Sequence, residues 1–376
     1  MIAFDYEYKN HAEIDLCRLV GNFKCLTKNA QSYNKNAKPI CVVKADAYGH
    51  GARECVRALE GAGADFFAVS DVQEAFEVRE VSPSSKILIL GYANPKNAPA
   101  LAKNKIIQAL HSYEYAMSLE RELSECNEKL SVHIKLDTGM SRIGFATGER
   151  LSSSLEEIKK VCALPHLCVE GVFSHLACAD EVSDMTDVQI KRFDEAVSAI
   201  RKIKGDIASH ICNTAASMTR GSAGHDYFRL GISLYGYLPS YEMEFSGILP
   251  VMSLYSTVAQ VHTLHKGDCV SYGATYCAER DMQVATVAIG YADGLMRAST
   301  GAYLYVNGQK AKILGRVCMD QCIVCIDGLD VKEGDEVTLY DRDGQNMKDL
   351  SRHLGTISYE LACAVGKRIP RIYMQG

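Results

Sequence analysis

Short apolar segments recur at regular intervals through the first 240 or so residues of the chain. Between them lie stretches with the spacing of amphipathic helices, such as residues 54–63, 112–126 and 189–203. Apolar strands that alternate with helices are typical of a parallel sheet covered by helices. Eight such units in about 240 residues predict an α/β fold, a closed (β/α)₈ barrel. The eight apolar segments are residues 39–43, 66–70, 86–90, 106–110, 131–136, 168–173, 209–213 and 227–232.

The pattern changes after about residue 245. Apolar and polar positions now alternate, and Asn307-Gly308 is a strong hairpin signal. One helical stretch, residues 346–366, follows these strands. We therefore predict a barrel over residues 1–244 and a mainly antiparallel β domain over residues 245–376. The alternating segments are residues 256–264, 283–290, 302–315 and 335–344.

Composition narrows the possible partners. The 376 residues are 47% hydrophobic and 23% charged, with a formal net charge of -5. No apolar run is long enough to span a membrane, and a basic surface for nucleic acid is not indicated. The N-terminal segment lacks the basic and apolar regions of a secretory signal, so we expect a cytoplasmic protein. The fifteen cysteines, such as Cys41, Cys162 and Cys363, are expected to be buried reduced thiols.

Polar residues follow the predicted strands of the barrel. In this fold the carboxyl ends of the strands meet at one face, where active sites form. The alignment of so many polar residues at these ends predicts an active site for a small molecule. The residues concerned are Lys44, Asp137, Arg142, His175, Asn213, Thr214 and Arg229.

Lys44 has two interpretations. A partly desolvated lysine is a usable amine nucleophile that forms Schiff bases with carbonyl compounds. Taken alone, however, Lys44 is more simply explained by an ion pair with Asp46 or another acid at the rim of the barrel. The ends of strands seven and eight favour the first interpretation. Thr214 offers a hydroxyl and Gly231 an unhindered backbone N–H, and phosphate sites commonly form from these two loops. A phosphorylated aldehyde cofactor, pyridoxal 5'-phosphate, on Lys44 is therefore a coherent hypothesis.

Seven separated motifs resemble those of the alanine racemase family, in the family's order and across both domains. The resemblance implies an isomerase that uses pyridoxal phosphate to interconvert L- and D-alanine and so supplies D-alanine for peptidoglycan. It also implies a homodimer whose active sites are shared between subunits. The motifs are VVKADAYGHG, KLDTGMSRIGF, HLACADE, RLGISLYG, SYGATY, GYADG and GRVCMDQ.

The resemblance also implies roles for individual residues. Lys44 and Tyr272, the latter from the second subunit, would be the two acid/base groups on opposite faces of the cofactor. Arg142 and Met319 would meet the substrate carboxylate. Lys135, which many members carry carbamylated, would support the site together with Asp320 and Tyr291. The implied cofactor-binding residues are Lys44, Tyr48, Arg142, His175, Asn213, Thr214, Arg229, Gly231, Ile232 and Tyr359.

The resemblance further implies that Arg229 would face the pyridine nitrogen of the cofactor. A guanidinium does not readily give up a proton, so the ring nitrogen would stay unprotonated and the electron sink would be weakened. We hypothesise that this limits transamination. A tyrosine phenol is a weak base at neutral pH. The resemblance implies that His175 would help Tyr272 by bridging it to Arg229.

The sequence also allows three other interpretations. Residues 318–325, CMDQCIVC, have a spacing that can hold an iron–sulfur cluster, but in a strand Cys325 would face away from Cys318 and Cys322. A carrier that only binds pyridoxal phosphate would lack the β domain. A decarboxylase of the same architecture would be expected to place an acid, where Arg229 stands, against the pyridine nitrogen.

Overall fold

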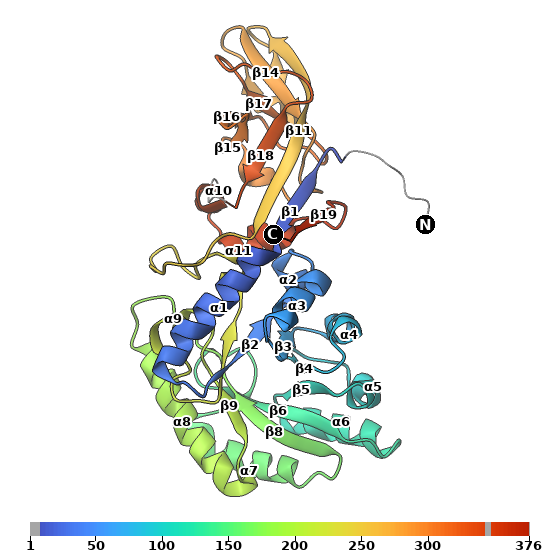
Figure 1. Ribbon diagram of the computed structural model, residues 1–376, viewed down its shortest axis with the longest axis vertical. Helices are drawn as coiled ribbons and strands as arrows, with labels where there is room; N and C mark the ends of the chain where they lie inside the picture. Colours follow the sequence, from blue (N-terminus) through green and yellow to red (C-terminus); the bar gives the residue numbers. More distant parts are fainter. Residues whose placement is uncertain (1–7, 343–346, 376) are drawn as a thin grey trace. The chain divides into compact units, whose positions relative to one another are not determined.

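The computed structural model describes residues 8–342 and 347–375 of the chain. These residues form two compact units (Figure 1). The barrel unit comprises residues 19–47 and 52–248. The β-unit comprises the described parts of residues 1–18, 48–51 and 249–376.

Eight parallel strands form the closed sheet of the barrel unit. Each strand pairs with the next along the chain, β5 pairs with β6, and β10 pairs with β2, which closes the ring. The predicted (β/α)₈ barrel is therefore confirmed, and all eight predicted segments contribute a strand. A short strand, β7 (Phe145–Ala146), extends β6. The barrel strands are β2 (Lys38–Val42), β3 (Phe66–Val69), β4 (Lys86–Ile89), β5 (Ile106–Leu110), β6 (Leu130–Asp137), β8 (Leu167–Phe173), β9 (Ala208–His210) and β10 (Tyr227–Leu230).

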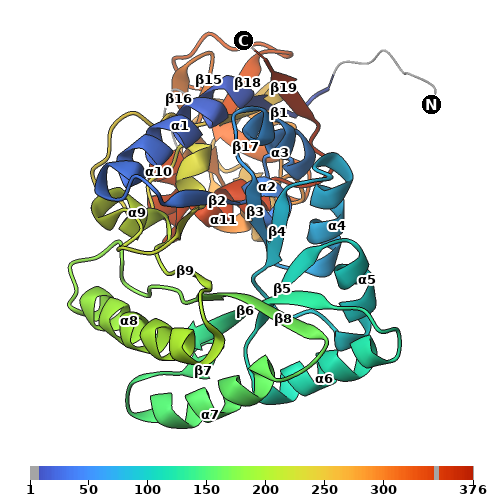
Figure 2. The ribbon, with the colours of Figure 1, turned by 60° about the horizontal axis from the view of Figure 1, so that its bottom comes forward.

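Helices cover the outside of these strands, as Figure 2 shows for α4 to α7. They do so because each presents one apolar face: α3, for example, buries Cys55, Val56 and Leu59. Local capping fixes where helices begin, as where Asp71 accepts a hydrogen bond from the backbone of Glu74 at 3.0 Å at the start of α4. The helices are α1 (Leu16–Tyr33), α3 (Ala52–Gly61), α4 (Val72–Val81), α5 (Ala98–Lys103), α6 (Tyr113–Ser124), α7 (Leu151–Cys162), α8 (Met185–Lys204) and α9 (Thr214–Arg220).

The β-unit is built on an eight-stranded sheet in which most neighbours are antiparallel. The long strand β11 pairs with β18, β14 and β1, and Figure 1 shows it running beside β18. β12 and β13 form a separate two-stranded sheet. The predicted β-rich region is therefore confirmed. Its strands are β1 (His11–Asp15), β11 (Met252–Leu264), β12 (Cys269–Val270), β13 (Tyr276–Cys277), β14 (Met282–Val287), β15 (Tyr303–Val306), β16 (Gln309–Leu314), β17 (Cys322–Cys325), β18 (Glu336–Tyr340) and β19 (Arg371–Met374).

Two local predictions for the β-unit can be compared with the structure. The Asn307-Gly308 turn joins β15 to β16, and both residues have positive φ, as this turn requires. The single predicted helical stretch is two helices, because Gly355 adopts a φ of 65° between them. These helices are α10 (Met347–Leu354) and α11 (Ser358–Ala364). Short 3₁₀ segments are η1 (Pro95–Asn97), η2 (Gly148–Arg150), η3 (Ile232–Tyr235), η4 (Tyr272–Ala274) and η5 (Arg297–Ser299).

The expectation that all the cysteines are reduced and buried is wrong in two respects. Cys269 and Cys277 form a disulfide, because antiparallel pairing of β12 with β13 places them opposite each other with their Cα atoms 4.0 Å apart. Their spacing in the sequence does not reveal this pairing. Among the free thiols Cys41 is buried as predicted, but Cys162 is only partly buried and Cys363 is exposed.

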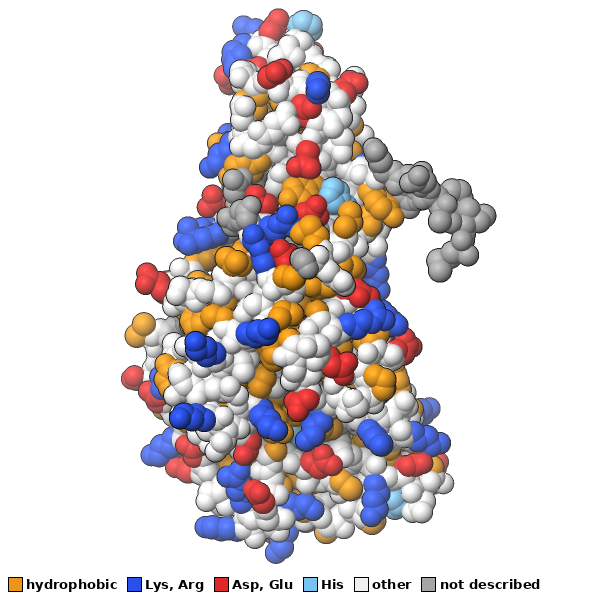
Figure 3. Space-filling model, viewed as in Figure 1, with side chains coloured by type: hydrophobic (Ala, Val, Ile, Leu, Met, Phe, Trp, Pro, Cys, Tyr) orange, Lys and Arg blue, Asp and Glu red, His pale blue; other side chains and the backbone are white. Residues whose placement is uncertain are grey.

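The described residues contain neither a membrane-spanning helix nor a cluster of metal ligands. No helix in residues 8–342 and 347–375 is long and apolar enough to cross a membrane. In the same residues, no three His, Cys, Asp or Glu side chains are grouped so as to hold a metal ion, and Cys322 and Cys325 lie on opposite faces of β17. On the face that Figure 3 shows, acidic and basic side chains are interspersed.

Candidate active site

Lys44 follows the buried strand β2 and begins an unusual turn, α2 (Lys44–Tyr48). The four residues after it, 45 to 48, have φ between 51° and 53°. For non-glycine residues this left-handed conformation costs about 1–2 kcal/mol per residue, so surrounding contacts must hold it. In the barrel unit, the backbone N–H of Ala45 donates to Glu74 at 2.6 Å, and that of Ala52 donates to Asp46 at 2.7 Å. The partly buried Lys44 is thus presented from a turn that is held at both ends.

Arg229 is a buried charge on β10, only 3% exposed. Its Nη1 donates to His210 Nδ1 at 2.7 Å, and its Nη2 donates to the carbonyl oxygens of Ser174 at 2.7 Å and Ile211 at 2.8 Å. No hydrogen bond from its Nε–H is found among the residues that the structure describes. The pKa of Arg229 is lowered to about 10, chiefly by burial; Cys212 opposes this shift and the charge of Arg142 contributes to it. The side chain therefore remains charged at neutral pH.

His175 follows β8 and lies beside Arg229, with Arg229 Nη2 3.3 Å from His175 Nδ1. A guanidinium can only donate, so Nδ1 accepts and the proton sits on Nε2. Burial holds the pKa of His175 well below its usual value, and the positive charges of Arg229 and Arg142 act in the same direction. The histidine is therefore neutral at pH 7 and has one N–H to donate on its other side.

Lys135 is an amine on β6 that is only 5% exposed, and its Nζ donates to the carbonyl oxygen of Leu136 at 2.7 Å. Burial lowers the pKa of Lys135 to about 7; the charge of Arg229 contributes in the same sense, and Asp137 opposes it. A large share of this amine is consequently neutral at pH 7. A neutral amine is the form that reacts with carbon dioxide or other electrophiles.

Arg142 lies on an exposed loop after β6. The loop is shaped by the Asp137 carboxylate, which accepts backbone hydrogen bonds from Gly139 at 3.0 Å and Ser141 at 2.9 Å. Although exposed, Arg142 is close enough to His175 and Arg229 for its charge to lower the pKa of both. The predicted group of Lys135, Arg142, His175 and Arg229 is thus brought together in the barrel unit.

The predicted phosphate-binding residues also lie together in the barrel unit. The backbone N–H of Gly231 donates to Thr214 Oγ1 at 2.7 Å, and Ile232 follows directly at the start of η3. The side chain of Asn213, which was predicted to bind the cofactor, caps α9 in this structure: its Oδ1 accepts a hydrogen bond from the backbone of Ala216 at 3.1 Å. These residues present a hydroxyl and backbone N–H groups within one small region.

Tyr48 and Tyr359 are neighbours within the β-unit, with ring centroids 6.0 Å apart. Their approach depends on Gly49, which has a φ of +80° and lies so close to α11 that an added Cβ would stand 2.1 Å from the carbonyl oxygen of Ala362. Only glycine fits there. The two predicted phosphate-binding tyrosines are therefore held side by side.

Four further predicted residues gather in the β-unit. A cavity of about 540 Å³ is lined by Tyr272, Met319 and Asp320, together with three neighbouring residues. The backbone of Tyr291 donates to the carbonyl oxygen of Cys318 at 3.0 Å, which ties it to the same segment. Tyr272 is 71% exposed and Met319 is 52% exposed. Two large apolar side chains thus stand in solvent at the place where the prediction puts the second subunit.

With this geometry in hand, comparisons with known proteins identify the family. A family model described as the alanine racemase N-terminal domain matches residues 14–239, and the corresponding C-terminal domain model matches residues 251–373. The chain belongs to the alanine racemase family. The resemblance in the seven motifs is therefore confirmed, and so is the assignment to the amino-acid racemases, a class of isomerases.

Individual relatives in this family cover nearly the whole chain. Alanine racemase 1 of Clostridium acetobutylicum is 38% identical over 374 residues, which is 97% of this chain and 95% of that protein. The structure of alanine racemase from Clostridium difficile 630 has a TM-score of 0.91 at 35% identity, covering 98% of this chain and 97% of that one. The alanine racemase of Bacillus anthracis with bound L-Ala-P has a TM-score of 0.90 at 32% identity, covering 99% and 97%.

Sequence reasoning missed a buried pair of histidines beneath Arg229. His210 accepts from Arg229, and its Nε2 lies 3.1 Å from His133 Nδ1. Burial lowers the pKa of His133 to about 3 and that of His210 well below its usual value, so both are neutral. Gly171 makes room, since a Cβ there would stand 2.6 Å from the His133 ring. The available signal was His133 standing two residues before Lys135, on the same face of the strand.

We expect His210 to stabilise the fold by satisfying the buried guanidinium. Changing His210 to phenylalanine keeps the ring volume but leaves an Arg229 N–H without its acceptor, which should lower the free energy of unfolding by about 1.5–3 kcal/mol. His210→Asn retains an acceptor and should cost less. Urea unfolding of both variants measures the difference. Equal stability of the phenylalanine variant and the wild type would show that the bond contributes nothing.

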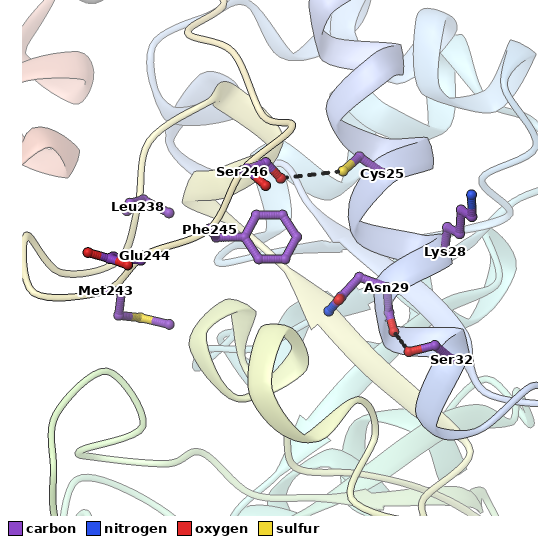
Figure 4. A pocket seen from close by; sticks show the side chains of 9 residues that line it. All are labelled: Cys25, Lys28, Asn29, Ser32, Leu238, Met243, Glu244, Phe245 and Ser246. Atoms are coloured by element: carbon purple, nitrogen blue, oxygen red, sulfur yellow. Dashed lines mark hydrogen bonds between the residues drawn. The ribbon is translucent and has the colours of Figure 1, made fainter.

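A larger groove of about 930 Å³ lies elsewhere on the barrel unit. Figure 4 shows that one wall is a face of α1 and the other is the segment from Met243 to Ser246, with Cys25 Sγ 3.9 Å from the carbonyl oxygen of Ser246. None of the residues predicted for the active site lines this groove. Its size alone therefore does not connect it with the chemistry.

Proposed function

We propose that this chain is a pyridoxal-phosphate-dependent alanine racemase that acts as a homodimer. Membership of the family supports the reaction. The observation that carries the cofactor assignment is the Nε–H of the buried Arg229, which makes no hydrogen bond to the protein atoms that the structure describes. A D-alanine product would serve peptidoglycan synthesis in the cytoplasm of a bacterium.

The residues present fit this cofactor. Lys44 would hold its aldehyde carbon, and Arg229 Nε–H would meet the ring nitrogen. The hydroxyl of Thr214 and the backbone of Ile232 would donate to the phosphate at the ends of the last two barrel strands, and Gly231, whose N–H donates to Thr214 Oγ1 in this structure, would turn that N–H to the phosphate as well. Asn213 lies beside them at the start of α9. Tyr48 and Tyr359 would add their hydroxyls. When bound, pyridoxal phosphate makes the α-proton of an attached amino acid removable by delocalising the electrons left behind.

Racemisation needs one acid/base group on each side of the α-carbon. Lys44 is the proposed group on one side, and Tyr272 of the second subunit is the proposed group on the other. The exposure of Tyr272 and Met319 supports a shared site, because a partner surface would cover both side chains. Arg142 and the backbone of Met319 would bind the substrate carboxylate, with Tyr291 and Asp320 lining the approach.

The neutral His175 has a definite part in this scheme. Its Nδ1 accepts from Arg229, so its Nε2–H can donate to the phenolic oxygen of Tyr272. That hydrogen bond would stabilise the phenolate, the form that can accept a proton. The fixed positive charge of Arg229 would in turn leave the ring nitrogen unprotonated and so limit transamination.

A coupled assay with D-amino-acid oxidase tests the proposed function. Purified protein is given a panel of L-amino acids, with and without added pyridoxal phosphate. We expect alanine to be among the best substrates and activity to depend on the cofactor. Release of carbon dioxide from amino acids would favour a decarboxylase, and cofactor binding without any turnover would favour a carrier.

Lys135 is expected to carry a carbamate, and more of it as the pH rises past about 7, because only the neutral amine reacts with carbon dioxide. The carbamate would pair with Arg142 and hold it toward the substrate. ¹³C NMR in labelled bicarbonate should show a carbamate signal that is lost in Lys135→Arg. Lys129→Arg, which changes an exposed lysine just before the same strand, should keep the signal. A signal unaffected by Lys135→Arg would contradict the assignment.

A further inference from the structure

The loop that carries Tyr272 is tied only weakly by its backbone. It connects β12 to β13, which are two residues long and form a sheet of their own. Beyond the Cys269–Cys277 pair, the ladder toward the loop contains only Val270 opposite Tyr276. A two-stranded ladder is marginally stable by itself, so the position of this one also depends on Val270, which is buried in a hydrophobic cluster of the β-unit, and on Tyr276, which packs against that cluster.

The backbone of the loop is also held in costly conformations. Ser271 has φ 63° and ψ −173°, and Ala274 has φ 46°, on either side of Tyr272 and Gly273. Such geometry for non-glycine residues persists only where surrounding contacts enforce it. Among the described residues, Ser271 Oγ donates to the carbonyl oxygen of Arg316 at 2.6 Å and lies 3.2 Å from Cys318 Sγ. The backbone of Ala274 donates to that of Ser271 at 3.2 Å.

The Cys269–Cys277 disulfide closes this loop covalently. On one side of the disulfide is the Val270–Tyr276 pair, and on the other side is Ala278. The carbonyl oxygen of Ala278 accepts from the backbone of Gly267, and its N–H donates to the carbonyl oxygen of Asp268, both at 2.8 Å. The disulfide therefore restricts how far the two ends of the segment that contains Tyr272 can move apart. Both cysteines are exposed, unlike the buried Cys322, so soluble reagents can reach them.

We propose that Cys269 and Cys277 are a redox-sensitive pair that positions Tyr272. This inference rests on the proposed function, because Tyr272 is there an acid/base group. A dithiol reductant would attack one sulfur to form a mixed disulfide, and its second thiol would then displace the protein sulfur. The protein gains two thiols, and the reductant leaves as its own disulfide, so two electrons and two protons are transferred.

Opening the disulfide releases the loop without removing any group that binds cofactor. The expected result is a fall in kcat of about 3- to 10-fold, since misplacement of a catalytic group by about 1 Å can cost up to 100-fold. The KM for pyridoxal phosphate and its absorbance should stay unchanged. Regulation would follow the redox poise of the compartment, with the oxidised form being the more active one.

The experiment compares oxidised and dithiothreitol-reduced holoenzyme with the variant Cys269→Ser/Cys277→Ser. The oxidised wild type should be fastest, the reduced wild type should match the double variant, and the double variant should not respond to reductant. Reoxidation should restore the wild type alone. Cys126→Ser, a change of an exposed free cysteine in the barrel unit, should respond to reductant like the wild type.

Mass spectrometry after alkylation under non-reducing conditions establishes whether the pair is oxidised. Two alkylated thiols at these positions in oxidant-treated protein would overturn the inference, and so would equal kcat in the oxidised, reduced and serine forms. Absence of racemase activity from every form would overturn the proposed function instead, so the two failures are distinguishable.

Discussion

Replacing Lys44 by alanine is expected to reduce racemase activity by about 10⁴-fold or more. Proton transfer by a single positioned group is typically worth about 10²–10⁴-fold, and Lys44 would also lose its second task, holding the cofactor. Borohydride reduction of the wild type should leave pyridoxal phosphate attached to the peptide that contains Lys44, as peptide mass spectrometry would show. The alanine variant should carry no such adduct.

Lys38 offers a matched control for this substitution. It stands at the other end of the same strand, β2, and is exposed. Lys38→Ala should keep both activity and the borohydride adduct, because that end of a barrel strand contributes to stability rather than chemistry. An adduct found on another lysine, or an active Lys44→Ala enzyme, would remove the basis of the proposed mechanism.

The barrel could be predicted from the sequence because its strands are buried on both sides. Segments such as residues 66–69 and 106–110 are fully buried in the structure, and a continuous apolar run is the local signature of that environment. β1 gave no such signature. It is five residues long, alternates between partly and fully buried positions, and pairs with β11 and β19, which lie more than 200 residues away in the chain. Pairing at that separation is set by tertiary packing.

Some residues of the candidate site could likewise be predicted from the sequence, and others could not. Residues inside recognisable motifs, such as Lys44 and Arg229, could be found from the sequence. His210 and the Cys269–Cys277 pair could not, because their significance comes from partners on neighbouring strands. The register between strands decides which side chains meet, and it is not visible in either strand alone.

Basic side chains from several separate motifs gather around His175. Lys44, Lys135, Arg142 and Arg229 all act on His175 to lower its pKa, in addition to burial. Several basic groups gathered around one histidine favour anionic ligands. A phosphorylated cofactor and a substrate carboxylate supply the negative charge that such a region requires, which supports the proposed function independently of the individual roles.

The proposal that each active site is shared between two subunits predicts complementation between inactive variants. Tyr272→Phe removes only a hydroxyl and should reduce activity by about 10²–10⁴-fold. Co-expression of Lys44→Ala and Tyr272→Phe chains with different affinity tags allows their mixed dimers to be isolated. In such a dimer one site carries both changes and the other carries neither, so about half of the wild-type activity should return.

A second mixed dimer makes the test decisive. When both changes are placed on one chain and paired with a wild-type chain, a shared site leaves each of the two sites with one defect, and activity should be low. If instead Lys44 and Tyr272 of the same chain acted together, this dimer would retain about half of the activity and the first mixed dimer would be inactive. The two arrangements therefore predict opposite outcomes from the same pair of substitutions.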